Sequence, residues 1–207
     1  TLRSRGFDVL LYTFDAPTPG DRPHVDPEVL RRRVDGILVV GLPLAREEVA
    51  ALEALGQPIV CIGWGAYGQV TVRLDDRGTA MAATRHLLAL GHTRIAHITG
   101  APDDVAPLSP PVERAAGWRA EMVEAGLDPS PELEAHGNFD VAGGRAATRE
   151  LLERVPDVTA VFAASDEMAM GAYLALRDLG LRVPEDVSLI GIDGHDLGEL
   201  VGLTTMA

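Results

Sequence analysis

Two polar positions in this sequence directly follow apolar runs, and their side chains could bind a ligand. Asp193 comes after "SLIGI", and the pair Ser165-Asp166 comes after "AVFAA". In open parallel sheets, ligands bind outside the carboxyl ends of the strands, where such residues lie. The Asp193 carboxylate either accepts hydrogen bonds from ligand hydroxyls or caps the segment that follows. Ser165 or Asp166 either faces the same site or caps the helix predicted by "DEMAMGAYLALRDLG".

Three further side chains could contact a ligand from loops or from a helix end. Arg114, in "PPVERAAGW", lies near the start of a predicted helix. Its guanidinium is either a fork-shaped donor to a polar ligand or an exposed helix charge. Trp64 and Phe139 lie at loop positions of a chain with only 4% aromatic residues, so each is a candidate for stacking on a ligand.

The stretch "CIGWGAYGQVTVRLDD" has the spacing of a dinucleotide-binding fingerprint, Gly63-x-Gly65-x-x-Gly68. The fingerprint functions only where these glycines open a helix, whose free N–H groups hold the pyrophosphate. Here the β-branched run after Gln69 predicts an extended segment, and Ala83 stands where the acidic residue for the ribose is expected. The sequence therefore predicts a glycine-rich loop between strands and no dinucleotide cofactor.

Other catalytic and metal-binding patterns are absent from the sequence. The histidines form no H-x-x-x-H or Cys/His spacing, so no metal site is expected. No serine lies in a G-x-S-x-G elbow, and no basic residue is Lys, which excludes Schiff-base and P-loop lysine chemistry in this segment. Cys61 is the only cysteine, and its place in "PIVCIG" predicts a buried small hydrophobe. We therefore expect neither an enzyme nor a cofactor.

The elements that would position these residues follow from hydrophobic periodicity. Short apolar runs alternate with amphipathic stretches, which is typical of βα units around a parallel sheet. The continuous apolar character of the runs indicates a sheet covered on both faces, and hence a doubly wound α/β architecture. Strands are predicted at 8–14, 36–40, 58–62, 95–99, 160–164 and 188–192, and helices at 27–34, 45–55, 78–90, 112–125, 141–153 and 167–179.

The net charge of −13 restricts the partners of this segment. A chain with this charge repels phosphate backbones and anionic lipid surfaces, so the segment is not expected to bind nucleic acid itself. No window approaches 18 uninterrupted apolar residues, and the first residues lack a signal-peptide pattern. The sequence therefore predicts neither a membrane span nor export.

Several strings together resemble the effector-binding core of LacI/GalR-family transcriptional regulators. They are "DDRGTAMAATRHLLALGHTRIAHITG", "ERAAGWRAEMVEAGL", "SDEMAMGAYLALRDLGLRVPEDVSLIGIDG" and "LTTM", with "RSRGFDVLLY" and "VDGILVVG" nearer the start. The resemblance implies a periplasmic-binding-protein type I fold, with two similar doubly wound parallel-sheet subdomains and a ligand cleft between them. It places an N-terminal subdomain at 1–75, a C-terminal subdomain at 76–203 and a crossover back to the first at 204–207. The opening reads as a helix end and then a strand, so we expect the first strand and helix of the N-terminal subdomain to be missing here.

The resemblance also implies a function. A small polar effector such as a sugar would bind in the cleft and change the affinity of a cytoplasmic homodimer for operator DNA. A helix-turn-helix domain missing from this segment would contact that DNA, and no membrane partner is implied. The alternative is a solute-binding receptor of an importer, which shares the fold but would carry a signal peptide; the string "VPEDVSLIGID" favours the regulator.

Residue by residue, the resemblance supports the candidates above. The family's cleft arginine corresponds to Arg114, its strand-end acid to Asp193 and its aromatic between the two units of the C-terminal subdomain to Phe139. Ser165 and Asp166 stand where sugar-responsive members often carry Asn-Asp, so a direct amide contact to a hydroxyl is replaced by a serine hydroxyl. The expected ligand contacts are Arg114, Asp193, Phe139, Ser165, Asp166 and Trp64.

Overall fold

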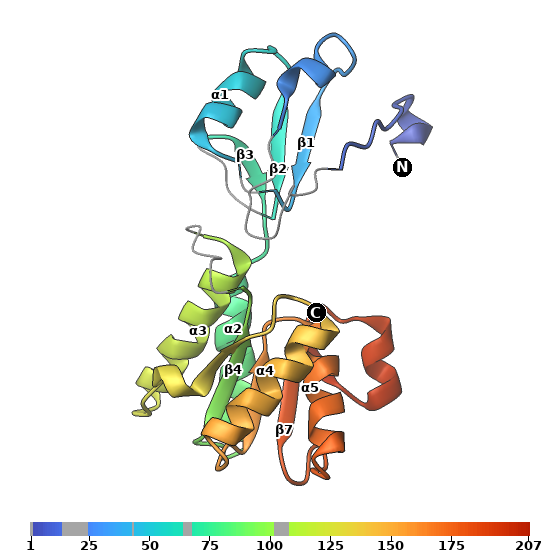
Figure 1. The fold of residues 1–207 in the computed structure, drawn as a ribbon. Coiled ribbons are helices and arrows are strands. Elements are labelled where there is room, and N and C mark those ends of the chain that lie inside the picture. The colour runs from blue at the N-terminus through green and yellow to red at the C-terminus, as the bar shows by residue number, and fades with distance from the viewer. Residues whose placement is uncertain (1, 14–24, 43, 64–67, 102–107) are drawn as a thin grey trace. The chain divides into compact units, whose positions relative to one another are not determined.

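A computed structural model of the chain describes residues 2–13, 25–42, 44–63, 68–101 and 108–207. The chain divides into two compact units, Thr1–Leu74 and Asp75–Ala207 (Figure 1). Each unit contains one parallel sheet, which confirms the predicted α/β class. The division falls one residue before the predicted boundary.

The second unit is built around a five-stranded parallel sheet with the order β5-β4-β6-β7-β8. Its two central apolar strands, β4 and β6, are buried at every position, as the continuous apolar runs predict. The strands are β4 (Ile95–Thr99), β5 (Glu134–His136), β6 (Ala160–Ala163), β7 (Ser188–Ile192) and β8 (Thr204–Met206).

Four helices cover the two faces of this sheet. They are α2 (Asp76–Ala89), α3 (Pro110–Glu124), α4 (Val141–Arg154) and α5 (Asp166–Asp178). The chain leaves β4 toward β5 through α3 and returns to β6 through α4. Because crossovers between parallel strands are right-handed, these opposite directions place α3 and α4 on opposite faces. The helix α2 packs on α3 and α5 packs on α4, so the second unit is doubly wound (Figure 1).

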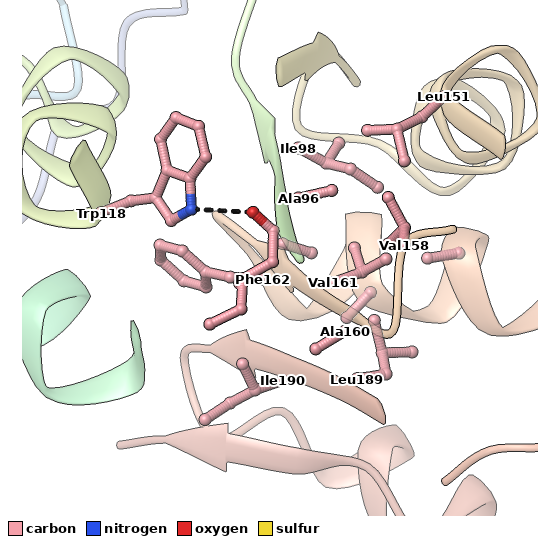
Figure 2. Close-up of a cluster of buried hydrophobic side chains, with 14 of the residues drawn as sticks. Ala96, Ile98, Trp118, Leu151, Val158, Ala160, Val161, Phe162, Leu189 and Ile190 are labelled. Atoms are coloured by element: carbon pink, nitrogen blue, oxygen red, sulfur yellow. Dashed lines mark hydrogen bonds between the residues drawn. The ribbon is translucent and has the colours of Figure 1, made fainter. Parts of the chain in front are cut away.

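The core of the second unit lies between these layers (Figure 2). Trp118 of α3 and Phe162 of β6 are fully buried, and the Trp118 indole N–H donates to the carbonyl of Ile95 over 3.3 Å. The ring of His97 on β4 stacks against both aromatic rings, with centroid distances of 5.5 Å to Trp118 and 4.7 Å to Phe162. The mid-helix tryptophan is therefore a core residue.

The first unit has a smaller parallel sheet with the order β1-β2-β3. Its elements are β1 (Ile37–Val40), β2 (Ile59–Ile62), β3 (Val70–Val72), α1 (Arg46–Glu53) and the 3-10 helices Arg3–Arg5 and Pro27–Leu30. The chain after Gly68 continues into β3, so the last glycine of the fingerprint leads into a strand and not into a helix, while Gly65 lies outside the described residues. This outcome matches the interpretation drawn from the sequence.

Two predicted elements of the first unit are wrong. Residues 8–13 of the strand predicted at 8–14 form no strand, because a strand needs a hydrogen-bonded neighbour and the described residues provide none. The helix predicted at 27–34 is only the 3-10 helix Pro27–Leu30, because the backbone leaves the helical region at Arg31 and Arg32, whose ψ of 120° and φ of 58° are not helical. In the second unit, the short strands β5 and β8 were not predicted. β8 pairs with β7, and the crossover proposed at 204–207 stays a prediction.

Candidate ligand-binding site at the carboxyl edge of the second sheet

Four of the six residues singled out by the sequence lie together in the second unit. Ser165 and Asp166 follow β6, and Asp193 follows β7, at the carboxyl ends of neighbouring strands. Arg114 reaches the same edge from α3, where its Nη1 donates to the backbone carbonyl of Ala164. The charges of Arg114 and Asp166 both act on the Asp193 carboxyl group. The four residues therefore form one polar cluster.

The two aromatic candidates are not part of this cluster as described. Phe139 lies between β5 and α4 with a φ of 57°, and it packs partly buried against the hydrophobic core of the second unit. Trp64 lies outside the described residues. The stacking roles expected of both residues stay predictions.

Arg114 is held in place by a buried acidic partner, Asp76, at the start of α2. Its Nε and Nη2 each lie 2.8 Å from the Asp76 Oδ1, and both residues are only 6% exposed. The two helices approach closely because Gly117 carries no side chain: a Cβ there would lie 2.5 Å from the carbonyl oxygen of Arg77. The string "RAAGW" thus positions the Arg114 guanidinium, and the Asp76 carboxylate balances most of its positive charge.

Asp166 is fully buried at the first position of α5. Its Oδ2 accepts a hydrogen bond from the backbone N–H of His195 over 2.7 Å and another from the hydroxyl of Thr205 over 2.9 Å. The carboxylate lies at the N-terminus of α5, where the free N–H groups of the first turn attract negative charge. Asp166 therefore connects the loop after β7 and the strand β8 to the start of α5.

Asp193 is the exposed acid of the cluster, and its backbone has an unusual conformation. Its φ is +128°, a region that side chains with a Cβ rarely adopt and that costs of order 1–3 kcal/mol where neighbouring structure imposes it. Although the residue is exposed, the protein around its carboxyl group removes part of the solvation and raises the pKa. The positive charge of Arg114 opposes this effect, while the negative charges of Glu167 and Asp166 add to it.

Ser165 has a local structural role. It is the N-cap of α5, and its hydroxyl accepts a hydrogen bond from the backbone N–H of Met168 over 3.2 Å. The side chain is 2% exposed. The capping interpretation that the sequence left open therefore accounts for this hydroxyl.

Two residues that contact the cluster were not singled out from the sequence, Asp76 and Thr205. Asp76 occurs in "LDDRG", where its neighbour Asp75 is the N-cap of α2 and is the simpler explanation for an acid at that place. Thr205 occurs in "LTTM", which carries a resemblance but no chemical pattern. Both roles depend on contacts between elements distant in the chain, and a local pattern does not contain them.

The described part of the chain offers no metal site. Within these residues no group of three or more His, Cys, Asp or Glu side chains could hold a metal ion. In the same residues, every helix is too short or too polar to cross a membrane.

Comparisons with known proteins place this geometry in a family. The chain matches the family described as a periplasmic binding protein-like domain over residues 84–207. It is 38% identical over 203 residues to the HTH-type transcriptional regulator CelR of Thermobifida fusca, which covers 96% of this chain and 58% of CelR. It is 32% identical to the ribose operon repressor of Escherichia coli K12, covering 95% of this chain and 59% of the repressor.

A solved structure supports the same placement. The transcriptional regulator CelR–cellobiose complex has a TM-score of 0.78 and 37% sequence identity, and the match covers 86% of this chain and 56% of that one. The chain spans somewhat more than half the length of the curated relatives it matches. These relatives are regulators of transcription and not enzymes.

Proposed function

We propose that this chain binds a small polyhydroxylated effector such as a sugar. The chain belongs to the periplasmic-binding-protein-like family and is the effector-binding domain of a LacI-type transcriptional regulator. The observation that carries the proposal is the exposed Asp193 carboxylate, held on a strained backbone beside the buried Arg114–Asp76 pair. An ionised carboxylate accepts strong hydrogen bonds from hydroxyl groups, and the guanidinium N–H groups not used by Asp76 and Ala164 can donate to ligand oxygens.

The charges of the cluster favour an uncharged ligand. Asp76 balances the guanidinium of Arg114, whereas Asp193, Asp166 and Glu167 are further carboxylates within electrostatic reach of one another. A phosphate group at this edge would meet more negative than positive charge. Neutral sugars and other polyols avoid that repulsion and still use both the acceptor and the donor. This choice is in keeping with the cellobiose bound to CelR.

The wider proposal is that the ligand regulates DNA binding. We propose that the whole protein is a cytoplasmic homodimer that binds operator DNA through a helix-turn-helix domain outside this chain. The names of the two relatives, an HTH-type regulator and an operon repressor, support this role. An effector shifts such a protein only by its difference in affinity between two conformations, and a coupling of about 1–3 kcal/mol would change operator affinity about 5- to 150-fold.

The test of the ligand proposal is calorimetric titration of the chain with cellobiose, ribose and other neutral sugars. We expect one of them to bind, and Asp193→Ala to weaken its binding about 10- to 150-fold, since a hydrogen bond to a charged group contributes about 1.5–3 kcal/mol. The matched control is Asp196→Ala, which removes an exposed carboxylate three residues further along the same loop region. If no neutral sugar binds, or if both variants bind as the unchanged chain does, the proposal is wrong.

The test of the regulatory proposal is the gene itself. The codons upstream of Thr1 are expected to encode a helix-turn-helix domain, and purified full-length protein is expected to bind operator DNA as a dimer. A secretory signal in that position would make the protein an exported receptor and would overturn the regulatory role while leaving the ligand site intact.

We also propose that a strand and a helix of the same polypeptide, outside residues 1–207, complete the sheet of the first unit. Among the described residues, the edge strand β1 pairs only with β2, and its apolar residues Leu38 and Val40 are 56% and 67% exposed. A cavity of about 560 Å³ separates β1 from the unpaired segment that contains Leu10 and Leu11. An added strand would pair with β1 and fill this space. Extending the chain upstream is expected to raise the thermal stability of the first unit; no change would count against this proposal.

A further inference from the structure

Thr205 lies on β8 and was not among the candidate ligand contacts, yet it contacts the loop that carries Asp193. Its hydroxyl oxygen accepts a hydrogen bond from the backbone N–H of Gly194 over 3.2 Å. The same hydroxyl donates its proton to the Oδ2 of Asp166 over 2.9 Å. One side chain thus links the residue after Asp193 to a buried carboxylate.

The loop after β7 is fastened through three consecutive N–H groups. The N–H of Asp193 donates to the carbonyl of Met206 over 2.9 Å, that of Gly194 donates to Thr205, and that of His195 donates to Asp166 over 2.7 Å. All three acceptors belong either to β8 or to the first residue of α5. The strained backbone at Asp193 is therefore held from both sides of the residue.

The absence of a side chain at Gly191 leaves room for the buried Asp166 carboxylate. Asp166 packs against Gly191 on β7, where any Cβ would overlap its Oδ1, so only glycine leaves room. A fully buried carboxylate is expensive unless it is hydrogen-bonded, and the described bonds to it come from His195 and Thr205. Removing the hydroxyl of Thr205 takes away one of these bonds and leaves the Gly194 N–H without its acceptor.

We propose that Thr205 is a positioning residue for the effector. Its hydroxyl bridges the Asp166 carboxylate and the Gly194 N–H by two hydrogen bonds and so holds the Asp193 carboxylate in its ligand-binding orientation. The inference rests on the proposed function for the role of Asp193 as a ligand contact. Strain of this kind persists only where the surroundings enforce it, and the Thr205 hydroxyl accepts one of the three N–H hydrogen bonds that hold this loop. Loss of the hydroxyl lets the backbone relax and moves the carboxylate.

The first experiment needs no ligand. Amide hydrogen exchange at Asp193, Gly194 and His195 is measured by NMR in the unchanged chain, in Thr205→Val, in Thr205→Ser and in Thr204→Val. We expect Thr205→Val to accelerate exchange about 5- to 10-fold, as for the loss of one hydrogen bond, and Thr205→Ser to restore protection. Thr204→Val, at an exposed neighbour on the same strand, is the matched control and should change nothing. Unchanged exchange in Thr205→Val overturns the proposal.

The second experiment uses the neutral sugar that binds the chain, with cellobiose as the first probe. Thr205→Val is expected to weaken binding about 5- to 10-fold, and Thr205→Ser and Thr204→Val to bind normally. In a background of Asp193→Ala, Thr205→Val should add no further loss, because it acts through that carboxylate. A full additional loss would show that Thr205 acts by another route and would overturn the proposal. If no sugar binds, the proposed function is wrong. The exchange experiment would still decide whether Thr205 holds the loop after β7 in place.

Discussion

The two units of this chain are built from similar sequence patterns, but they bury their strands to different degrees. In the second unit, every residue of β4 and β6 is buried. In the first, alternate residues of β1 remain exposed, and Leu38 and Val40 face outward from it. A continuous apolar run predicts a strand that is covered on both faces, but alternate residues of β1 are exposed. In our proposal, a strand and a helix outside residues 1–207 cover β1.

The units also differ in how they use the edges of their sheets. The carboxyl edge of the second sheet brings Arg114, Asp166 and Asp193 together with their supporting contacts. The cavity of the first unit is lined mainly by aliphatic residues, including Leu10, Leu30 and Leu52. The first arrangement is suited to a polar ligand, and the second to packing by another part of a protein.

The largest expected effect separates the two cores. Trp118→Ala should destabilise the second unit by about 3–5 kcal/mol, because it leaves a large cavity and an unpaired carbonyl at Ile95. Denaturant unfolding followed by circular dichroism measures the change in the free energy of unfolding. The control is Val40→Ala in the exposed strand β1, with an expected cost below about 0.5 kcal/mol. Equal effects of the two variants would contradict the contrast between the units.

The second effect concerns acid. Burial lowers the pKa of His97 to about 3, and the charges of Arg119 and Arg114 act in the same direction. In the unfolded chain this histidine titrates near 6.5, so the second unit is most stable above that pH and loses stability as the pH falls from 6.5 toward 3. The loss is about 1.4 kcal/mol per pH unit, or about 3 kcal/mol at pH 4 relative to pH 7.

The variant that tests this effect is His97→Leu, which places an apolar side chain that cannot be protonated against Trp118 and Phe162. The variant is expected to be less stable at pH 7, because it lacks the ring contacts and the hydrogen bond to the Phe162 carbonyl. Its stability should fall less steeply between pH 6.5 and pH 4. Parallel pH profiles for the two proteins would show that His97 does not set the acid sensitivity.

A smaller pair of effects compares the helix caps of the two units. Asp140, the N-cap of α4, accepts a hydrogen bond from Gly143, and Asp140→Ala should cost about 1 kcal/mol. In the first unit, Ala45 occupies the N-cap of α1 and has no side-chain acceptor, so Ala45→Ser should add about 0.5–1 kcal/mol. Local amide exchange in each helix measures both changes. A loss of protection in α1 after Ala45→Ser would contradict the capping argument.

Most elements of the second unit could be predicted from the sequence because each is locally determined. The strands Ile95–Thr99 and Ser188–Ile192 have the predicted bounds, and the helices differ by one or two residues at their ends. Their apolar period and their caps lie within the same short stretch of chain. Residues 8–13 show the limit: their composition suits a strand, but pairing requires a partner that the pattern cannot supply.

The candidate site could be predicted in its positions but not in its contacts. The rule for strand ends pointed to Asp193 and Asp166, and the "RxxGW" string pointed to Arg114. The sequence could not tell that Asp166 is fully buried while Asp193 is exposed, since both follow similar apolar runs. The contacts that surround Asp166 come from residues distant in the chain, among them Thr205, which lies 39 residues away.

The smallest expected effect is the sharpest test of the contrast between the units. Val40→Thr keeps a β-branched side chain at a position that is 67% exposed, so in residues 1–207 it should change the free energy of unfolding by less than about 0.5 kcal/mol. In a longer chain that contains the proposed additional strand and helix, the same hydroxyl would be buried without a partner, and the cost should rise to about 1–3 kcal/mol. Measuring the variant in both backgrounds by denaturant unfolding decides between the two situations. An equal, negligible cost in the longer chain would mean that β1 stays uncovered there, and the proposal that upstream residues complete the sheet would be wrong.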